Sequence, residues 1–210
     1  MLLEEMLKLA PVVPVIVIND INHAVPLARA LVSGGLPVLE VTLRTAVAME
    51  AVRLIADQVP DAIIGVGTVT RAEQFEASRK AGARFAVSPG LTPALISASR
   101  DIDLPFLPGV FTPTEALCAR DEGFNILKLF PAEQAGGVGM LKAMGSPMPE
   151  LKFCPTGGIG PTSVLDYLKL PNVLCVGGSW VAPPQAMNSD NWGLVTQLAA
   201  EVVRSAKRSG

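Results

Sequence analysis

The sequence predicts an α/β fold, a (β/α)8 TIM barrel with an extra N-terminal helix, and three observations support this prediction. Eight short apolar runs rich in Val, Ile, Leu and Phe recur along the chain, and their starts are 21 to 26 residues apart. The segments between them have helical periodicity, as at Val52, Ile55 and Val59. Several runs are continuously apolar, which is typical of parallel strands that are buried on both faces of a sheet.

The expected elements follow one another in a regular order. A helix over residues 2–9 comes first, where it would plug or flank the barrel. The eight expected strands are residues 12–18, 37–43, 62–68, 83–88, 104–110, 125–130, 151–156 and 173–179. Among the helices between them, two are expected to begin with a capping box, at residues 70–73 (TRAE) and 112–115 (TPTE). Pro113 would occupy the first helical position of the second helix, where its missing N–H does no harm.

The chain length limits what can be added to this barrel. Its 210 residues lie close to the lower limit of the fold, which is about 200 residues. One domain over residues 1–210 is therefore predicted, without a lid or a second domain. An open doubly wound sheet is the structural alternative, but its glycine fingerprint GxGxxG is absent after the first run.

Composition and charge exclude several classes of partner. The 17 Lys and Arg against 19 Asp and Glu leave a formal net charge of −2, and 5% of the residues are aromatic. Such a chain has neither a basic face nor a stacking platform for nucleic acid. The uncharged stretch over residues 170–189 is interrupted by prolines and glycines, which argues against a membrane-spanning helix. Glu4 and Glu5 stand where a signal peptide has positive charges, so a cytoplasmic protein is expected.

The few cysteines and the single histidine also limit the chemistry. Cys118, Cys154 and Cys175 are an odd number at wide spacing, and His23 has no partner at a metal-ligand interval. Neither a disulfide framework nor a histidine-rich zinc site is expected. The chemistry would depend on Lys, Glu, Arg, Ser, Thr and backbone groups, or on a borrowed cofactor.

Lys128 is the most informative polar residue, because the active sites of such barrels lie at the carboxyl ends of the strands. It is the only lysine in the middle of an apolar run, NILKLF. Apolar surroundings remove solvation from the ammonium form, so the neutral amine could attack a carbonyl carbon and form a Schiff base. The alternatives are a snorkelling lysine whose head reaches water, or a partner for a nearby acid.

Glu40 is the only carboxylate inside these runs apart from those at their boundaries. Charged side chains are almost never buried unless they are paired, so one interpretation is an ion pair with Lys128 or Arg44. The functional interpretation is a general acid and base for the proton transfers that an iminium intermediate requires. Arg44 could hold a substrate carboxylate by two parallel hydrogen bonds, or it could be a surface arginine at the start of a helix.

Glycine pairs end the seventh and eighth runs, on adjacent strands of the expected barrel. Many barrels bind a phosphate at this place through backbone N–H groups, although glycine pairs at strand ends are more often plain turns. The two positions together favour phosphate. The residues are Gly157, Gly158, Gly177 and Gly178, with Ser179 next. Pro89, which follows the fourth run, is expected to shape the rim of the pocket.

Six segments resemble, in this order, those of one enzyme family. They are EVTLRT (residues 40–45), GVGTV (65–69), SPG (88–90), KLFPAE (128–133), CPTGGI (154–159) and GGSW (177–180). In these segments the chain is similar to the 2-keto-3-deoxy-6-phosphogluconate (KDPG) aldolases, a family that includes 4-hydroxy-2-oxoglutarate (KHG) aldolase activity. The resemblance extends from about the first expected strand to the last helix.

The resemblance implies a class I aldolase that uses neither a metal nor another cofactor and is a homotrimer. Lys128 would form a Schiff base with the keto carbon of the substrate, and Glu40 would be the general acid and base. KDPG would be cleaved to pyruvate and glyceraldehyde 3-phosphate, and KHG to pyruvate and glyoxylate. The implied substrate-binding residues are Arg44 and Thr68 for the pyruvate carboxylate, Phe130 and Thr156 for the pocket lining, and Gly157, Gly158, Gly178 and Ser179 for the phosphate.

Three alternatives stay open. A 2-keto-3-deoxy-6-phosphogalactonate aldolase differs at one hydroxyl of its substrate. A phosphate-binding isomerase or epimerase would rely on carboxylates and would not need a lysine inside a strand. A non-catalytic barrel that binds a phosphorylated sugar would not require Lys128, Glu40 and Arg44 together. Residues 181–192 (VAPPQAMNSDNW) are less familiar in this family and leave the phosphate end less defined.

Overall fold

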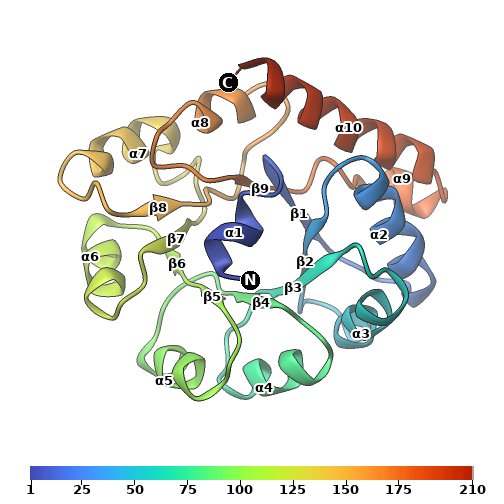
Figure 1. Ribbon diagram of the computed structural model, residues 1–210, viewed down its shortest axis with the longest axis horizontal. Helices are drawn as coiled ribbons and strands as arrows, with labels where there is room; N and C mark the ends of the chain where they lie inside the picture. The colour runs from blue at the N-terminus through green and yellow to red at the C-terminus, as the bar shows by residue number, and fades with distance from the viewer. Residues whose placement is uncertain (210) are drawn as a thin grey trace.

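The structure is a computed structural model that describes residues 1–209, so Gly210 of the predicted domain lies outside the described residues. Parallel strands alternate with helices along the chain and curl into a sheet, and the helices surround its outer face (Figure 1). The prediction of an α/β fold is confirmed.

Each of the eight apolar runs contains at least one strand. The fifth run contains two short strands, which are separated by Pro108. The strands are β1 (Val12–Ile16), β2 (Val38–Thr42), β3 (Ile63–Gly67), β4 (Phe85–Val87), β5 (Phe106–Leu107), β6 (Gly109–Val110), β7 (Ile126–Leu129), β8 (Lys152–Phe153) and β9 (Val176–Gly178).

Helices occupy the segments between the strands and both ends of the described chain. A short 3-10 helix, η1 (Ile21–His23), precedes the second helix. The α-helices are α1 (Leu3–Leu7), α2 (Ala24–Ser33), α3 (Ala48–Gln58), α4 (Glu73–Lys80), α5 (Pro93–Asp101), α6 (Pro113–Asp121), α7 (Gly137–Gly145), α8 (Val164–Leu168), α9 (Pro184–Asn188) and α10 (Trp192–Ser209).

The strands pair in parallel in two sheets, with the orders β5-β4-β3-β2-β1-β9 and β6-β7-β8. Two parallel bridges, Phe153–Val173 and Thr156–Gly177, link the segment around β8 to the segment around β9. The division between β5 and β6 has a local cause, because Pro108 has no N–H to donate to a neighbouring strand. Its carbonyl still accepts a hydrogen bond of 2.8 Å from the N–H of Lys128 in β7.

Two apolar cores lie on opposite faces of the curled sheet. The larger core packs the strands against the surrounding helices, with fully buried side chains such as Leu31, Val52 and Phe75. The smaller core, here called the inner cluster, consists of Met6, Leu7, Val13, Val38, Phe85, Val87, Leu107, Cys154 and Cys175. Successive side chains of a strand point to opposite faces, so the runs contribute to both cores.

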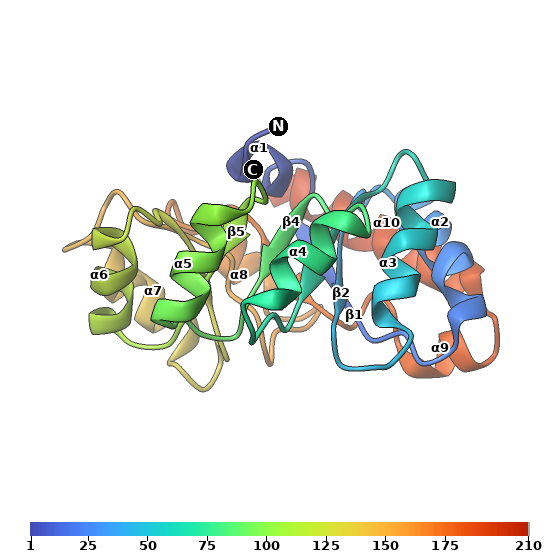
Figure 2. The same ribbon diagram turned by 90° about the horizontal axis from the view of Figure 1, so that it is seen from below.

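Helix α1 closes one end of the inner cluster. Its residues Met6 and Leu7 are buried there, and the helix leads directly into β1, so it lies at the amino ends of the parallel strands. Figure 2 shows α1 on one side of the molecule, away from α9 on the other. The carboxyl ends of the strands therefore point to the end of the molecule opposite α1.

One of the two predicted capping boxes is present. Thr112 is the N-cap of α6: its hydroxyl accepts a hydrogen bond from the N–H of Glu115, and the Glu115 carboxylate accepts one from the N–H of Thr112. The prediction for α4 was wrong, because this helix begins at Glu73 after Ala72. The side-chain oxygen of Gln74 accepts hydrogen bonds from the N–H groups of Thr70 and Arg71.

Within residues 1–209, no helix combines the length and the apolar character needed to cross a lipid bilayer. The uncharged stretch 170–189 contains β9 and α9 instead of one continuous helix.

Candidate active site

Lys128 of β7 and Glu40 of β2 form a buried ion pair, although 88 positions separate them in the sequence. The Lys128 Nζ lies 3.2 Å from the Glu40 Oε1, and the two side chains are 6% and 4% exposed. Burial of either charge alone would be costly, and the pairing offsets part of this cost. Of the two partners that the sequence left open for Glu40, the structure brings Lys128 within hydrogen-bond distance.

Gly67 of β3 makes room for the Glu40 carboxylate. A Cβ atom at position 67 would lie 2.7 Å from both the Cδ and the Cγ of Glu40, closer than such atoms approach in proteins. Gly67 is not among the site residues predicted from the sequence. The signal was present, because a glycine inside a strand often marks a close approach by another group.

Arg44 and Thr68 meet just beyond the carboxyl ends of β2 and β3. The Arg44 Nε donates a hydrogen bond of 3.1 Å to the Thr68 hydroxyl. Thr68 has a positive φ of 60°, which is uncommon for a residue that is not glycine and is often found at functional sites. This hydrogen bond uses the Nε–H alone and leaves the other N–H donors of the guanidinium group available for an anion.

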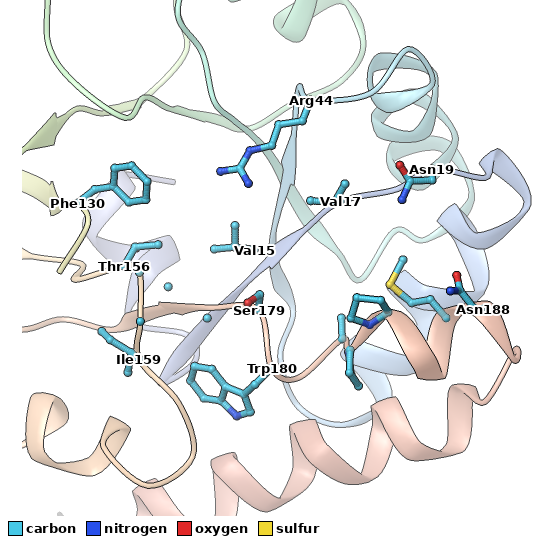
Figure 3. A pocket seen from close by; sticks show the side chains of 18 residues that line it. Val15, Val17, Asn19, Arg44, Phe130, Thr156, Ile159, Ser179, Trp180 and Asn188 are labelled. Carbon is cyan, nitrogen blue, oxygen red and sulfur yellow. The ribbon is translucent and has the colours of Figure 1, made fainter. Parts of the chain in front are cut away.

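A cavity of about 550 Å³ opens at the carboxyl ends of β1, β7, β8 and β9. Figure 3 shows Arg44 pointing into it between Phe130 and Val17, with Trp180 on the opposite side. Its volume is in the range of small-molecule sites. The predicted substrate-binding residues that line it are Arg44, Phe130, Thr156, Gly157, Gly158, Gly178 and Ser179.

The Lys128–Glu40 pair lies next to this cavity without being part of its lining. The Lys128 Nζ is 5.2 Å from the centre of the Phe130 ring, and Glu40 is paired in register with Val15; both Phe130 and Val15 line the cavity. Desolvated charges thus lie directly beside a space that can hold a small molecule. The arrangement suits proton transfer to and from a bound ligand.

Two of the predicted substrate-binding residues, Thr68 and Pro89, also lie outside the cavity lining. Thr68 is connected to the cavity through its hydrogen bond with Arg44. Pro89 lines a different cavity of about 560 Å³, which lies beside Gly109, Phe111 and the first residues of α5. The backbone of Pro89 packs closely against Gly109, so the turn at Pro89 faces the fifth run.

The two glycines that follow β8 are required by the local geometry. Gly157 and Gly158 have φ angles of 106° and 82°, a region that other residues rarely adopt. The carbonyls of Thr156 and Gly157 accept hydrogen bonds from the N–H groups of Ala132 and Glu133, at 2.8 and 3.1 Å. The loop that contains the glycine pair is therefore attached to the chain that follows Lys128.

Two buried thiols lie in the inner cluster near Glu40. The Cys175 Sγ is 3.5 Å from the Cys154 Sγ. The hydrogen bond to Cys154, burial and the negative charge of Glu40 all raise the pKa of the Cys175 thiol well above its ordinary value. The thiol stays protonated at neutral pH, so Cys175 does not compete with Glu40 as a base.

Comparison with known proteins agrees with this geometry. The chain matches the KDPG and KHG aldolase family over residues 3–198. The chain belongs to this aldolase family. The prediction that it resembles the family is confirmed.

Relatives in the aldolase family match almost the whole chain. A 2-dehydro-3-deoxy-phosphogluconate aldolase of Pseudoalteromonas atlantica is 50% identical over 203 residues, which cover 97% of this chain and 94% of the relative. A KHG/KDPG aldolase of Escherichia coli is 48% identical over 204 residues, which cover 97% and 96%. The crystal structure of a KDPG aldolase from Legionella pneumophila, with pyruvate captured at low pH as a covalent carbinolamine intermediate, has a TM-score of 0.93. It is 48% identical and covers 95% of this chain and 97% of its own.

Several cavity residues of this aldolase were not selected from the sequence. Asn19 directly follows the first run, and its position as a polar residue at a strand end is a signal that the sequence contains. Trp180 belongs to the GGSW segment but was given no role. Met187 and Asn188 lie in α9, within the less familiar segment 181–192, and no sequence signal points to them.

Proposed function

We propose that the protein is a metal-independent class I aldolase that cleaves KDPG to pyruvate and glyceraldehyde 3-phosphate, with KHG as a second substrate. The observation that carries this proposal is the buried Lys128–Glu40 pair beside a cavity that also contains Arg44. Membership of the KDPG and KHG aldolase family supports the same reaction.

Lys128 is the nucleophile in this proposal. Once Glu40 takes a proton from the ammonium group across 3.2 Å, the neutral Nζ attacks the C2 keto carbon of the substrate. The resulting carbinolamine loses water with a proton from Glu40 and becomes an iminium ion. Formation of a carbinolamine from pyruvate in the Legionella enzyme is consistent with this step.

Glu40 then supports cleavage of the bond between C3 and C4. Its carboxylate removes the proton of the C4 hydroxyl, the C3–C4 electron pair moves into the iminium, and the aldehyde product leaves. Glu40 next protonates the enamine at C3, and water releases pyruvate from Lys128 with reversal of the first steps. One carboxylate can serve every step because it is alternately base and acid.

The remaining residues bind the two ends of the substrate. Arg44, oriented by Thr68, holds the pyruvate carboxylate, and Phe130 and Thr156 line the pocket around the reacting carbons. The phosphate is held by Ser179 and by the backbone of Gly157, Gly158 and Gly178, which line the same cavity. Pro89 lines a separate cavity, so this proposal gives it no contact with the substrate.

Borohydride reduction in the presence of pyruvate tests the mechanism. We expect a stable adduct on Lys128, identified by peptide mass mapping, and neither adduct nor turnover in Lys128→Ala. Lys152, the other lysine within a strand, is the matched control, and Lys152→Ala should form the adduct normally. Folded protein without an adduct on Lys128 would contradict a class I mechanism and favour the non-catalytic barrel or the isomerase.

The substrate epimers distinguish the alternative within the family. KDPG and 2-keto-3-deoxy-6-phosphogalactonate differ only at one hydroxyl, so the comparison of their kcat/KM values tests which epimer the enzyme prefers. A higher kcat/KM for the galactonate would reassign the substrate. The relatives named as 2-dehydro-3-deoxy-phosphogluconate aldolases support the gluconate.

We propose a closed (β/α)8 barrel in a single domain, with α1 covering its amino end. The split strand β5–β6 joins the two sheets on one side, because β5 pairs with β4 and β6 pairs with β7. The two bridges between the segments around β8 and β9 join them on the other side, and both connections support closure. The N–H of Gly177, which donates to the carbonyl of Pro155 at 2.9 Å, should then be protected from hydrogen exchange. Rapid exchange there would contradict a closed barrel.

We also propose a cytoplasmic homotrimer that binds neither nucleic acid nor membranes. The odd number and wide spacing of the three cysteines fit a reducing compartment. The trimer rests on the family resemblance. Light scattering that gives the mass of a single 22.0 kDa chain would contradict it.

A further inference from the structure

Tyr167 and Glu133 form a polar contact behind the loop that carries Gly157 and Gly158. Tyr167 lies in α8 and is 1% exposed, and its hydroxyl donates a hydrogen bond to the Glu133 Oε1. Glu133 is exposed and follows β7 in the KLFPAE segment. Neither residue lines the cavity: Glu133 contacts the glycine loop, and Tyr167 contacts Glu133.

Glu133 contacts the glycine loop through both its backbone and its side chain. Its N–H donates to the carbonyl of Gly157 at 3.1 Å. A Cβ atom at Gly158 would lie 2.7 Å from the Glu133 Cβ, so the side chain of Glu133 lies directly against this glycine. Both glycines have positive φ angles, and the Glu133 side chain packs against the loop in this conformation.

Tyr167 determines where the carboxylate of Glu133 points. A Cβ atom at Gly137 would lie 2.6 Å from the Tyr167 Oη, so glycine at this position gives the hydroxyl its space. Burial, together with the hydrogen bond to Glu133 and its negative charge, raises the pKa of Tyr167. The hydroxyl therefore stays protonated and donates throughout the physiological pH range.

We infer that Tyr167 and Glu133 are positioning residues for the phosphate end of the substrate. The pair holds Gly157 and Gly158 in the conformation that presents their backbone to the cavity, and it directs the carboxylate of Glu133 towards Tyr167. A free carboxylate beside this loop would repel a phosphate. The inference rests on the proposed function, because that proposal places the phosphate at this loop.

Tyr167→Phe tests the inference with three readouts. We expect kcat/KM for KDPG to fall about tenfold, chiefly through a higher KM, because one hydrogen bond to a charged group is lost. For 2-keto-3-deoxygluconate, which lacks only the phosphate, kcat/KM should change less than about twofold. Deuterium exchange at C3 of pyruvate, which needs Lys128 and Glu40 but no phosphate, should keep its wild-type rate.

Glu133→Gln is the matched variant. Its side-chain oxygen still accepts from Tyr167 and its stem still packs on Gly158, while the charge is gone. KM for KDPG should therefore stay at the wild-type value or fall. If Tyr167→Phe does not fold, Glu133→Ala at its exposed position makes the same test, with a raised KM for KDPG alone.

The outcomes separate this inference from the proposed function. An equal loss in all three readouts would assign Tyr167 a general structural role and overturn the inference, with the aldolase reaction intact. A wild-type enzyme that exchanges pyruvate but does not prefer KDPG over its unphosphorylated analogue would overturn the phosphate site and the inference together. A wild-type protein that does not exchange pyruvate would overturn the proposed function itself.

Discussion

Gly67 leaves the space that the Glu40 carboxylate occupies beside Lys128. A Cβ atom at this glycine would lie 2.7 Å from the Glu40 Cδ, so any side chain there would push the carboxylate away from the Lys128 Nζ. Proton transfer depends steeply on the distance between donor and acceptor, so a displaced Glu40 carboxylate would slow the reaction. Glycine at position 67 is therefore needed to keep the Glu40 carboxylate beside Lys128.

Gly67→Ala should slow turnover roughly a hundredfold, since a misplacement of about 1 Å can cost this much. The measurement is kcat for KDPG, with circular dichroism to verify the fold. Gly139→Ala is the control, because a Cβ there meets nothing within 4 Å and the residue lies on an exposed face of α7. Its kcat should not change. Equal rates for Gly67→Ala and the wild type would show that the Glu40 position has no effect on the reaction.

The residue at which a helix starts depends on which side chain accepts hydrogen bonds from the unpaired N–H groups of its first turn. The same sequence pattern can therefore cap one helix and not another. The pattern Thr-x-x-Glu caps α6 at Thr112, where the chain enters the helix in an extended conformation with φ of −115° and ψ of 158°. At Thr70 the pattern does not cap a helix, because the Gln74 side chain already accepts from the N–H groups of Thr70 and Arg71. Competition between neighbouring side chains for the same N–H groups thus decides where each helix begins.

Thr112→Ala should lower the free energy of unfolding by about 1 kcal/mol, because the N–H of Glu115 loses its acceptor. Thr70→Ala should lower the free energy of unfolding by less than about 0.5 kcal/mol, because Thr70 is exposed and its side chain does not cap α4. Urea denaturation of both variants measures the difference. If the two variants are equally destabilised, the cap at Thr112 does not stabilise α6.

The N-terminal helix completes a core that the strands alone leave open. Leu7 is fully buried and Met6 is 2% exposed against the inner cluster, while Leu9 at the end of the same segment is 49% exposed. The amino acid type of these residues does not distinguish them. Their burial depends on how α1 sits against the strands, which is a property of the whole molecule.

Leu7→Ala should therefore reduce the free energy of unfolding by about 2 to 5 kcal/mol, through lost burial and the cavity left behind. Leu9→Ala is the matched control and should change it by less than about 0.5 kcal/mol. Guanidinium denaturation measures both. A small effect at Leu7 would mean that α1 contributes little to the inner cluster.

Much of the fold could be predicted from the sequence, because burial on both faces of a parallel sheet produces apolar runs that are visible locally. Every expected strand is represented, and helix α1 lies within the expected residues 2–9. The interruption at Pro108 was not predicted, because the sequence does not show whether a neighbouring strand has a carbonyl that faces this position and lacks an N–H donor.

For the candidate site, the sequence by itself determined the residue types and their place at the strand ends, and six motifs determined the family. Only the tertiary structure decided which side chains meet. It paired Glu40 with Lys128, joined Arg44 to Thr68, directed Pro89 to another cavity and placed Tyr167 behind the glycine loop. The physical reason is that contacts between distant strands depend on register and curvature, which the whole chain sets together and no local pattern contains.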